Sequence, residues 1–316
     1  MAAAVLRWHH PPGLRERQGH RAIRRRPASG PTGHSHTRSK AGWAVDQPGP
    51  PSPWLRSIRA DFYCNGAGGG IGWELAQLFA ADGYGIALVG RDETRLEEAA
   101  ARLRTDYGVA THVCVQDLSA PGAVDRLVAT LHEWEVVVDA LVNNAGFGYD
   151  IRFVESDLAR QRALVQVNIE ALVELCHAFA PGMVERGSGA ILNVASIAGF
   201  MPGPFMATYY ASKAFVQSFT QALHAELRLR GVSVTALCPG PVRTEFWNTA
   251  DAGRTALARF AVSPSRVARS GYRALRWNKT LCVPGLVPKA AVFVTRLLPR
   301  SWMAAMAAAL QVPKRS

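Results

Sequence analysis

The sequence of 316 residues lacks long hydrophobic runs, although 48% of its residues are hydrophobic. No stretch of about 18 uncharged apolar residues occurs, which argues against a membrane-spanning helix. The five cysteines lie far apart and form no C-x-x-C pair, and no metal site is predicted. Three of them sit in apolar strand-like runs, where cysteine behaves as a small buried hydrophobe. Their placement predicts a reducing setting, and we expect a cytoplasmic protein.

Acidic residues are scarce at the N-terminal end of the chain. Residues 1–59 carry 11 Lys and Arg against Glu16 and Asp46, a net charge of +9. Residues 60–316 hold 25 Lys and Arg and 22 Asp and Glu, a net charge of only +3. Because the remainder of the chain is nearly balanced, no nucleic-acid partner is predicted for it.

The first 58 residues also have few aliphatic side chains and no steady period, and Gln47–Pro53 would break any regular element. This composition predicts a disordered basic leader, because too little apolar surface is available to offset the entropy of ordering. Three interpretations remain open: an organelle transit peptide, a contact of Arg24–Arg26 with nucleic acid or anionic lipid, and an extension without function. The last is favoured.

Apolar strand-like runs and helical patterns alternate through residues 59–288, which predicts a single α/β domain. Right-handed crossovers would give a doubly wound parallel sheet with helices on both faces. The predicted strands are Ala60–Cys64, Ile86–Val89, Thr111–Gln116, Val136–Val142, Gly189–Ala195, Val232–Gly240 and Leu281–Pro284. The predicted helices are Gly70–Ala81, Glu93–Tyr107, Gly122–Trp134, Leu158–Glu185, one from Tyr209 to about Arg230, and one from Pro264. Residues 289–316 form an apolar and basic C-terminal extension.

A glycine-rich turn at Gly66, Gly70 and Gly72 opens this domain with the spacing G-x-x-x-G-x-G. Glycines there allow positive φ and a close approach to a pyrophosphate, which the amides at the start of the next helix can bind. After the second predicted strand, Arg91 would accept a 2′-phosphate, whereas Asp92 would favour a ribose diol. Gly90 occupies the position where the diol carboxylate is expected. The sequence therefore favours NADP(H) over NAD(H); the alternative is an exposed arginine in a surface loop.

Tyr209 and Lys213 are spaced i, i+4 at the start of a helical pattern and share one face. An ammonium beside the phenol would lower its pKa from about 10, and Ser196, at a strand end, could hold a carbonyl oxygen against it. Asn168 lies among aliphatic residues, where it either holds the helix or anchors a water that relays protons. Tyr and Lys at this spacing are a weak signal alone, so the rest of the chain decides.

Together these motifs resemble the short-chain dehydrogenase/reductase family, over about residues 60 to 285. The matching residues are the Gly66/Gly70/Gly72 turn, Asp117-Leu118, Asn143–Gly146, Asn168, Ser196, Tyr209-x-x-x-Lys213 and Pro239-Gly240-x-x-x-Thr244. One departure is Asn65, where the family commonly has Thr. The resemblance implies a Rossmann-like fold and catalysis of hydride transfer to or from a nicotinamide cofactor.

The resemblance also implies roles for individual residues. Tyr209 would be the general acid/base, Lys213 would lower its pKa and hold the nicotinamide ribose, Ser196 would orient the substrate oxygen, and Asn168 would position a relay water. The implied cofactor-binding residues are Gly66, Gly70, Ile71, Gly72, Arg91, Asp117, Leu118, Asn144, Ala145, Gly146, Tyr209, Lys213, Pro239, Gly240, Val242 and Thr244.

Apolar residues after Thr244 predict a lid over a hydrophobic substrate, although core or dimer packing would explain each of them equally well. They are Phe246, Trp247, Leu257, Phe260 and Val262. The whole resembles the subgroup that acts on 3-ketoacyl and hydroxysteroid substrates. We expect a homodimer or homotetramer. The tail Ala290–Leu310 could cover a pocket, pack on a second subunit or lie on a membrane surface, and the membrane is not favoured.

Three other functions are weighed against the reductase. A cofactor-binding sensor on the same scaffold would lack a complete Ser/Tyr/Lys set, which is present here. A nucleic-acid binder would depend on the leader alone. A sugar-nucleotide epimerase usually has a differently spaced glycine turn and a larger C-terminal domain.

Overall fold

The computed structural model describes residues 61–65, 69–243 and 261–311, and all of them belong to one compact unit, Gly49–Ser316. The predicted leader and the predictions for Gly66, Thr244 and the first four lid residues lie outside the described residues. The strands are β1 Asp61–Asn65, β2 Gly85–Gly90, β3 Thr111–Val115, β4 Val138–Asn143, β5 Gly189–Val194, β6 Val232–Leu237 and β7 Leu281–Cys282. The α-helices are α1 Gly70–Ala81, α2 Glu93–Tyr107, α3 Ala123–Glu133, α4 Leu158–Val165, α5 Ala171–Arg186, α6 Ala207–Leu227, α8 Pro264–Arg276, α9 Leu286–Thr295 and α10 Arg300–Gln311.

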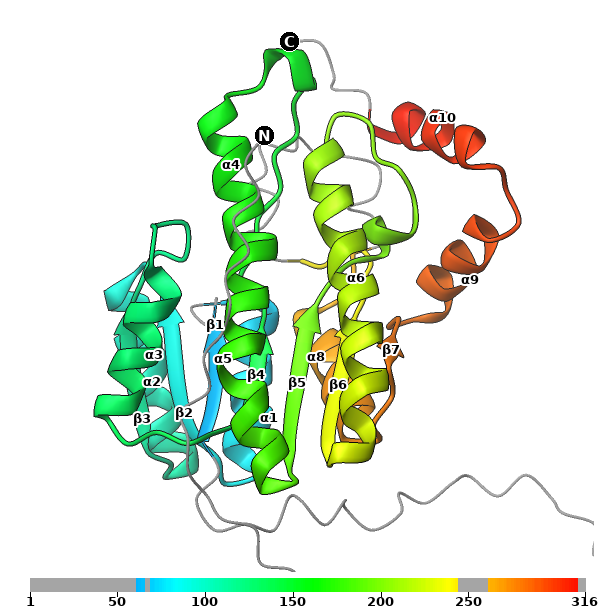
Figure 1. Cartoon of the computed structure of the whole chain (residues 1–316). Coiled ribbons are helices and arrows are strands. Elements are labelled where there is room, and N and C mark those ends of the chain that lie inside the picture. Colours follow the sequence, from blue (N-terminus) through cyan, green and yellow to red (C-terminus); the bar gives the residue numbers. More distant parts are fainter. Residues whose placement is uncertain (1–60, 66–68, 244–260, 312–316) are drawn as a thin grey trace, which may run out of the picture. The chain divides into compact units, whose positions relative to one another are not determined.

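The seven strands form one parallel sheet in the order β3-β2-β1-β4-β5-β6-β7. Figure 1 shows this order from left to right. The chain moves outward from β1 to β3, then returns to pair β4 with the other edge of β1, so the order reverses between β1 and β4. In open α/β sheets ligands bind at the carboxyl ends of the strands beside such a switch point. The predicted doubly wound α/β fold is confirmed.

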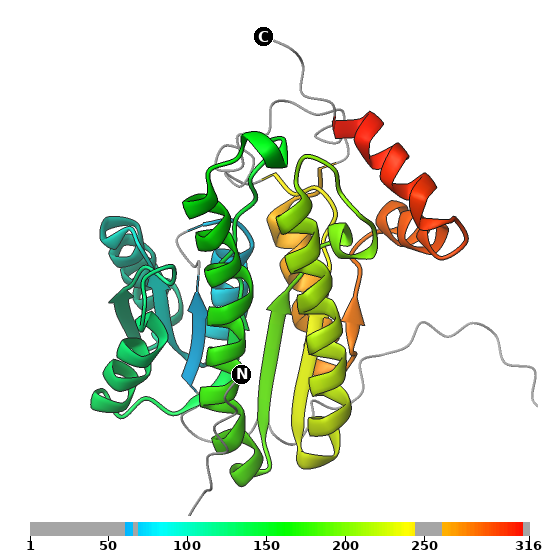
Figure 2. The same cartoon turned by 45° about the horizontal axis from the view of Figure 1, so that its top comes forward.

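Helices cover both faces of the sheet, because neighbouring side chains of each strand point to opposite faces. Ile86 and Leu88 of β2 pack in a core with α1, α2 and α8. Ala87 and Val89 of the same strand pack in a second core with α3, α5 and α6. Figure 2 shows the sheet between these two layers. Strands buried on both faces explain why the sequence reads as apolar runs rather than as alternating patterns.

The predicted helix Leu158–Glu185 differs from the structure in one respect. A π-helical turn, Gln166–Glu170, separates α4 from α5, and Asn168 lies in it. Such turns widen the helix by one residue and occur frequently at functional sites. Hydrophobic periodicity cannot reveal them, because the flanking helices keep the same direction.

One helical segment among the described residues, Leu158–Arg186, is long and apolar enough to cross a membrane by length and composition. Its side chains Leu172, Leu175, Cys176 and Met183 are buried in the core against the sheet. Burial against the sheet therefore accounts for part of its apolar composition.

Candidate active site

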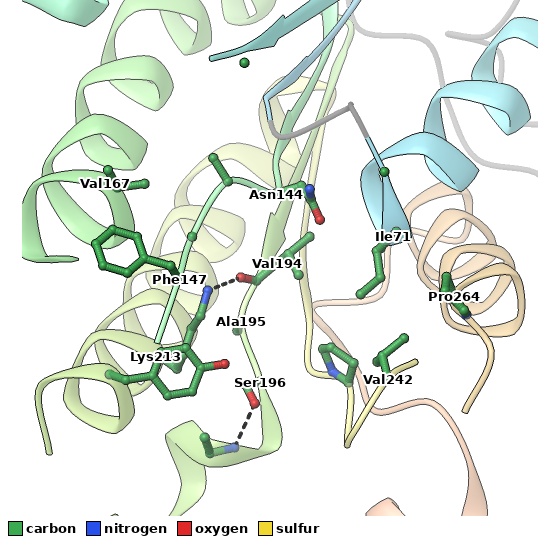
Figure 3. A pocket seen from close by; sticks show the side chains of 18 of the residues that line it. Ile71, Asn144, Phe147, Val167, Val194, Ala195, Ser196, Lys213, Val242 and Pro264 are labelled. Atoms are coloured by element: carbon green, nitrogen blue, oxygen red, sulfur yellow. Dashed lines mark hydrogen bonds between the residues drawn. The ribbon is translucent and has the colours of Figure 1, made fainter. Parts of the chain in front are cut away.

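A cavity of about 1640 Å³ opens at the carboxyl ends of the strands. This exceeds the roughly 300–1,000 Å³ of ordinary small-molecule pockets, so a dinucleotide and a second compound have room. Its lining includes, of the predicted residues, Gly70, Ile71, Arg91, Asp117, Leu118, Asn144, Ala145, Gly146, Ser196, Tyr209, Lys213, Pro239, Gly240 and Val242. Gly72 and Asn168 are buried and do not line it. Figure 3 shows Ile71, Asn144, Ser196 and Lys213 around this space.

The start of α1 forms one wall of the cavity. Gly70 has a φ of 57°, which a side chain would strain, and Gly69 before it caps the helix without a side-chain hydrogen bond. A helix start with this geometry suits a phosphate group, because glycines let the group approach the backbone closely and the helix dipole favours an anion.

The charged residues after β2 have separate tasks, which the sequence left undecided. Asp92 caps α2 by accepting a hydrogen bond from the Arg95 amide (3.1 Å), and its carboxylate lies 3.3 Å from Arg95 Nε. Arg91 is exposed and lines the cavity together with Arg95. Asp92 is thus engaged with its own helix, whereas two guanidinium groups face this end of the cavity. Sequence reasoning missed Arg95; its position four residues after Arg91 was an available signal.

Asp117 closes the same end of the cavity in a fixed orientation. Its Oδ1 accepts hydrogen bonds from the Ser119 amide (2.9 Å) and the Ser119 hydroxyl (2.7 Å). Burial would raise the pKa of Asp117, but these bonds and the charge of Arg91 outweigh it and lower the pKa. The carboxylate therefore stays ionised and is held beside Leu118 and Arg91.

Ser196, Tyr209 and Lys213 meet at the centre of the cavity. Ser196 Oγ accepts a hydrogen bond from the Ala198 amide (3.1 Å) and is hydrogen-bonded to the Tyr209 hydroxyl. Lys213 donates to the Val194 carbonyl (2.9 Å), and its Nζ lies 5.8 Å from the centre of the Tyr209 ring. Figure 3 shows both the Lys213–Val194 and the Ser196–Ala198 bond. The predicted trio is therefore brought together by the end of β5 and the first turns of α6.

The electrostatics of this trio correct one prediction. Burial raises the pKa of Tyr209 above its usual value; the hydrogen bond from Ser196 lowers it only in part, and nearby Tyr210 raises it further. Burial also lowers the pKa of Lys213 to about 8. The expected lowering of the Tyr209 pKa by Lys213 is thus wrong for this structure. The ammonium is bound to a strand carbonyl beside the ring, and removing both groups from water disfavours both charged forms.

Asn168 holds the wall of the site together from the π-helical turn. Its Oδ1 accepts from the Phe147 amide (3.1 Å), and its Nδ2 donates to the Phe147 carbonyl (3.1 Å) and to Ser212 Oγ (3.0 Å). Ser212 Oγ in turn donates to the Tyr209 carbonyl (2.7 Å). A Cβ added at Gly146 would lie 3.0 Å from Asn168 Oδ1 and 3.2 Å from Lys213 Nζ. The side chain of Asn168 therefore holds the segment at Phe147 against α6, and Gly146 leaves room for it.

No group of three or more His, Cys, Asp or Glu side chains that could hold a metal ion occurs among residues 61–65, 69–243 and 261–311. The residues that line the cavity fit a nicotinamide dinucleotide: a glycine-rich helix start, two guanidinium groups at one end, and a tyrosine with a lysine at the other. Fold and site together define a dinucleotide-dependent oxidoreductase.

Comparisons with known proteins agree with this class. The family model for short chain dehydrogenases matches residues 63–255. The chain is 40% identical to sulfoacetaldehyde reductase 2 of Chromohalobacter salexigens over 183 residues, which cover 57% of this chain and 72% of that protein. It is 35% identical to a very-long-chain 3-oxoacyl-CoA reductase of Anas platyrhynchos over 189 residues, 57% of this chain and 59% of that one. A short-chain dehydrogenase from Sphingobium yanoikuyae, solved in complex with NADPH, superposes with a TM-score of 0.68 at 29% identity, covering 81% and 98% of the two chains.

The chain belongs to the short-chain dehydrogenase/reductase family. It is accordingly an NAD(P)-dependent oxidoreductase that acts on CH–OH groups.

Proposed function

We propose that this protein interconverts a carbonyl and a secondary alcohol on a hydrophobic substrate, with NADP(H) as its cofactor. The observation that carries the proposal is the hydrogen-bonded Ser196–Tyr209 pair beside the buried Lys213, at the centre of a cavity large enough for cofactor and substrate.

The three side chains divide the work of proton transfer. In the direction of reduction, Tyr209 donates its proton to the substrate oxygen, and Ser196 donates a hydrogen bond to the same oxygen. The raised pKa keeps Tyr209 protonated at neutral pH, as an acid must be before it acts. Lys213, charged below about pH 8, lies beside the Tyr209 ring and would hold the nicotinamide ribose of the bound cofactor. NADPH, when bound, supplies the hydride, and the protein supplies position and the proton.

The lining of the substrate end of the cavity is suited to a hydrophobic compound. Its wall there is built mainly from apolar side chains, namely Phe147, Ala163, Val167, Met201, Met206, Ala291 and Ala307. A substrate oxygen at Tyr209 would leave the rest of the molecule against these residues. The relatives named above act on compounds as different as sulfoacetaldehyde and 3-oxoacyl-CoA, so the lining carries this part of the proposal. It favours lipid-like ketones of the ketoacyl or steroid type.

The preference for NADP(H) is supported by the charges at the other end. Arg91 and Arg95 face the cavity, and Asp92 is occupied as the cap of α2. A 2′-phosphate would meet Arg91 there, with Arg95 beside it in its ion pair with Asp92, whereas the carboxylate after β2 that a ribose diol would need is already engaged.

Replacing the proposed acid tests the reaction. Tyr209→Phe removes only the phenolic hydroxyl and should lower kcat by about 100-fold or more, because general acid catalysis contributes on this scale. NADPH binding, followed by fluorescence titration, should persist. Turnover is followed by NADPH absorbance with a panel of ketones and ketoacyl thioesters.

Tyr210→Phe is the matched comparison, because it removes a hydroxyl from the adjacent residue of the same helix. It should lose far less activity than Tyr209→Phe. Equal activity of the wild type and Tyr209→Phe would reject the assigned acid, and binding of NADPH without turnover of any compound would favour a sensor.

A further inference from the structure

The last two helices present an apolar face that nothing in the described part of the chain covers. Along α9 and the following turn, Leu286, Phe293 and Leu297 are 83%, 60% and 67% exposed. With Ala290 they are spaced i, i+4, i+7 and i+11, which places them on one side of the segment. On α10, Trp302 (64%) and Met306 (50%) are exposed one turn apart, whereas Met303 and Ala307 are buried. We call these residues, together with Val287 and Val294, the C-terminal apolar face.

The charges in this part of the chain have one sign. Residues 252–316 contain twelve Lys and Arg and no Asp or Glu. Residues 60–251 hold 13 Lys and Arg and 22 Asp and Glu, so the balanced charge of the domain conceals a separation into an acidic and a basic part. Lys289 of α9 and Arg296, which caps the C-terminus of that helix, are exposed among the apolar side chains. Exposed apolar residues with interspersed cations characterise helices that lie in the interface of an anionic bilayer.

We propose that the C-terminal apolar face docks on the surface of an anionic phospholipid bilayer. A two-fold contact of this face with a second copy is less favourable, because an isologous contact brings the same acid-free segments of both copies together. The Lys and Arg side chains of the two copies would then repel one another in an interface from which water is excluded. On a bilayer, Phe293, Leu297 and Trp302 enter the boundary between headgroups and acyl chains, and Lys289 and Arg296 meet lipid phosphates.

The C-terminal apolar face lies next to the substrate end of the cavity. Ala291 of α9 and Ala307 of α10 line the large cavity, so the same two helices border the substrate end and carry the exposed face. Figure 2 shows α9 and α10 beside α6, the helix that carries Tyr209. A hydrophobic substrate dissolved in the bilayer would thus reach the cavity without crossing water. The docking itself does not depend on the substrate proposed above.

Vesicle binding tests this surface directly. The full chain is sedimented with vesicles of phosphatidylcholine alone and of phosphatidylcholine mixed with phosphatidylglycerol. We expect binding to the mixed vesicles that weakens as salt is raised, since the cations are screened. Phe293→Glu combined with Trp302→Glu should lower the partition coefficient at least about tenfold, because two charges would have to enter the interface.

Leu229→Glu is the matched control. Leu229 is 80% exposed and lies in the 3-10 turn Arg228–Arg230, which precedes β6. It is therefore at the amino ends of the strands, whereas the cavity opens at their carboxyl ends. It should bind vesicles like the wild type. NADPH binding and sedimentation velocity like those of the wild type would show that the double variant is folded and has the same oligomeric state. If the Glu variant does not fold, Phe293→Ser combined with Trp302→Ser is used in its place.

Three results would overturn the proposal. The wild type could fail to bind mixed vesicles. The double variant could bind as well as the wild type, which would assign the binding to the basic leader present in every variant. The double variant could instead change the oligomeric state, which would make this face a contact between copies. None of these results depends on turnover, so they are separate from a failure of the proposed reaction.

Discussion

At the scale of single residues, burial is the strongest influence on the catalytic groups. Lys213 is 5% exposed, and it donates a hydrogen bond to the uncharged carbonyl of Val194. Its pKa is lowered from 10.5 to about 8 chiefly by burial. Keeping the Lys213 ammonium charged in this buried position therefore lowers the stability of the fold, as is common for strained or desolvated groups at functional sites.

The pKa of Lys213 predicts a pH dependence of folding. Between about pH 8 and 10.5 the unfolded chain keeps this proton and the folded chain releases it, so the free energy of unfolding rises with pH in that window. The contribution of Lys213 should grow by at most about 3 kcal/mol across it. Lys213→Met retains the length of the side chain without the charge and should lack this rise.

The measurement is urea unfolding of the cofactor-free wild type and Lys213→Met from pH 7 to pH 10.5. Buried thiols also contribute in this range, because burial raises their pKa in the folded chain. Cys176 is common to both proteins and cancels in the difference, whereas Cys238 interacts with the charge of Lys213 and is therefore replaced by Ala in both. A difference that stays flat with pH would mean that Lys213 titrates normally.

At the scale of secondary-structure elements, a buried amide network joins two strands and two helices beneath the site. Asn143 at the end of β4 donates to Asn193 Oδ1 (2.9 Å), and Asn193 of β5 donates to Thr220 Oγ1 of α6 (3.0 Å). Asn143 Nδ2 also lies 3.4 Å from Cys176 Sγ of α5. The network sets the spacing between β5, which leads to Ser196, and α6, which carries Tyr209.

Removing the centre of this network should destabilise the fold. Asn193→Ala removes the hydrogen bonds to Asn143 and Thr220, which keep their contacts with Cys176 Sγ and the Val216 carbonyl. Each lost bond costs about 0.5–1.5 kcal/mol, and the cavity left in the core adds to this loss. We expect a loss of about 3 kcal/mol in the free energy of unfolding, measured with urea.

Thr105→Ala serves as the control for that loss, because the Thr105 hydroxyl is exposed and bonds only its own helix at Ala101 (2.9 Å). It should change the stability by less than about 0.5 kcal/mol. Similar stabilities of Asn193→Ala and Thr105→Ala would show that the network is energetically neutral.

At the scale of the whole molecule, the cavity joins residues from both halves of the sheet. Arg91 and Asp117 come from the β2 and β3 side, and Tyr209 and Lys213 from the β5 and β6 side. A dinucleotide that contacts both ends binds only the folded chain, so it should raise the temperature of unfolding by mass action.

The cofactor preference can be measured through this linkage. At 100 times its Kd a ligand adds about 2.7 kcal/mol to the free energy of unfolding, so at equal concentration NADPH should raise Tm more than NADH does. Arg91→Ala should reduce the NADPH shift and leave the NADH shift nearly unchanged. Equal shifts with both nucleotides in the wild type, or equal losses in the variant, would contradict the preference.

Local patterns in the sequence were sufficient to predict the strands of the sheet and most of the helices, and to locate the active-site motifs. Apolar runs and periodic helices depend on neighbours in the chain, and the predicted bounds of α1 and α2 agree with the structure. The Tyr209–Lys213 spacing likewise places both residues on one face of a helix, whatever else the chain does. The doubly wound order followed, because right-handed crossovers leave few alternatives.

Other properties depended on which distant residues become neighbours, and only the tertiary structure decided them. The π-helical turn at Asn168, whose side chain bonds Phe147 and Ser212, and the raised pKa of Tyr209 arise from burial or from partners across the fold. The same holds for the exposed face of α9 and α10, since a sequence pattern shows that a helix has an apolar side but not whether anything covers it. Desolvation and long-range hydrogen bonds are properties of packing, and packing has no local signal.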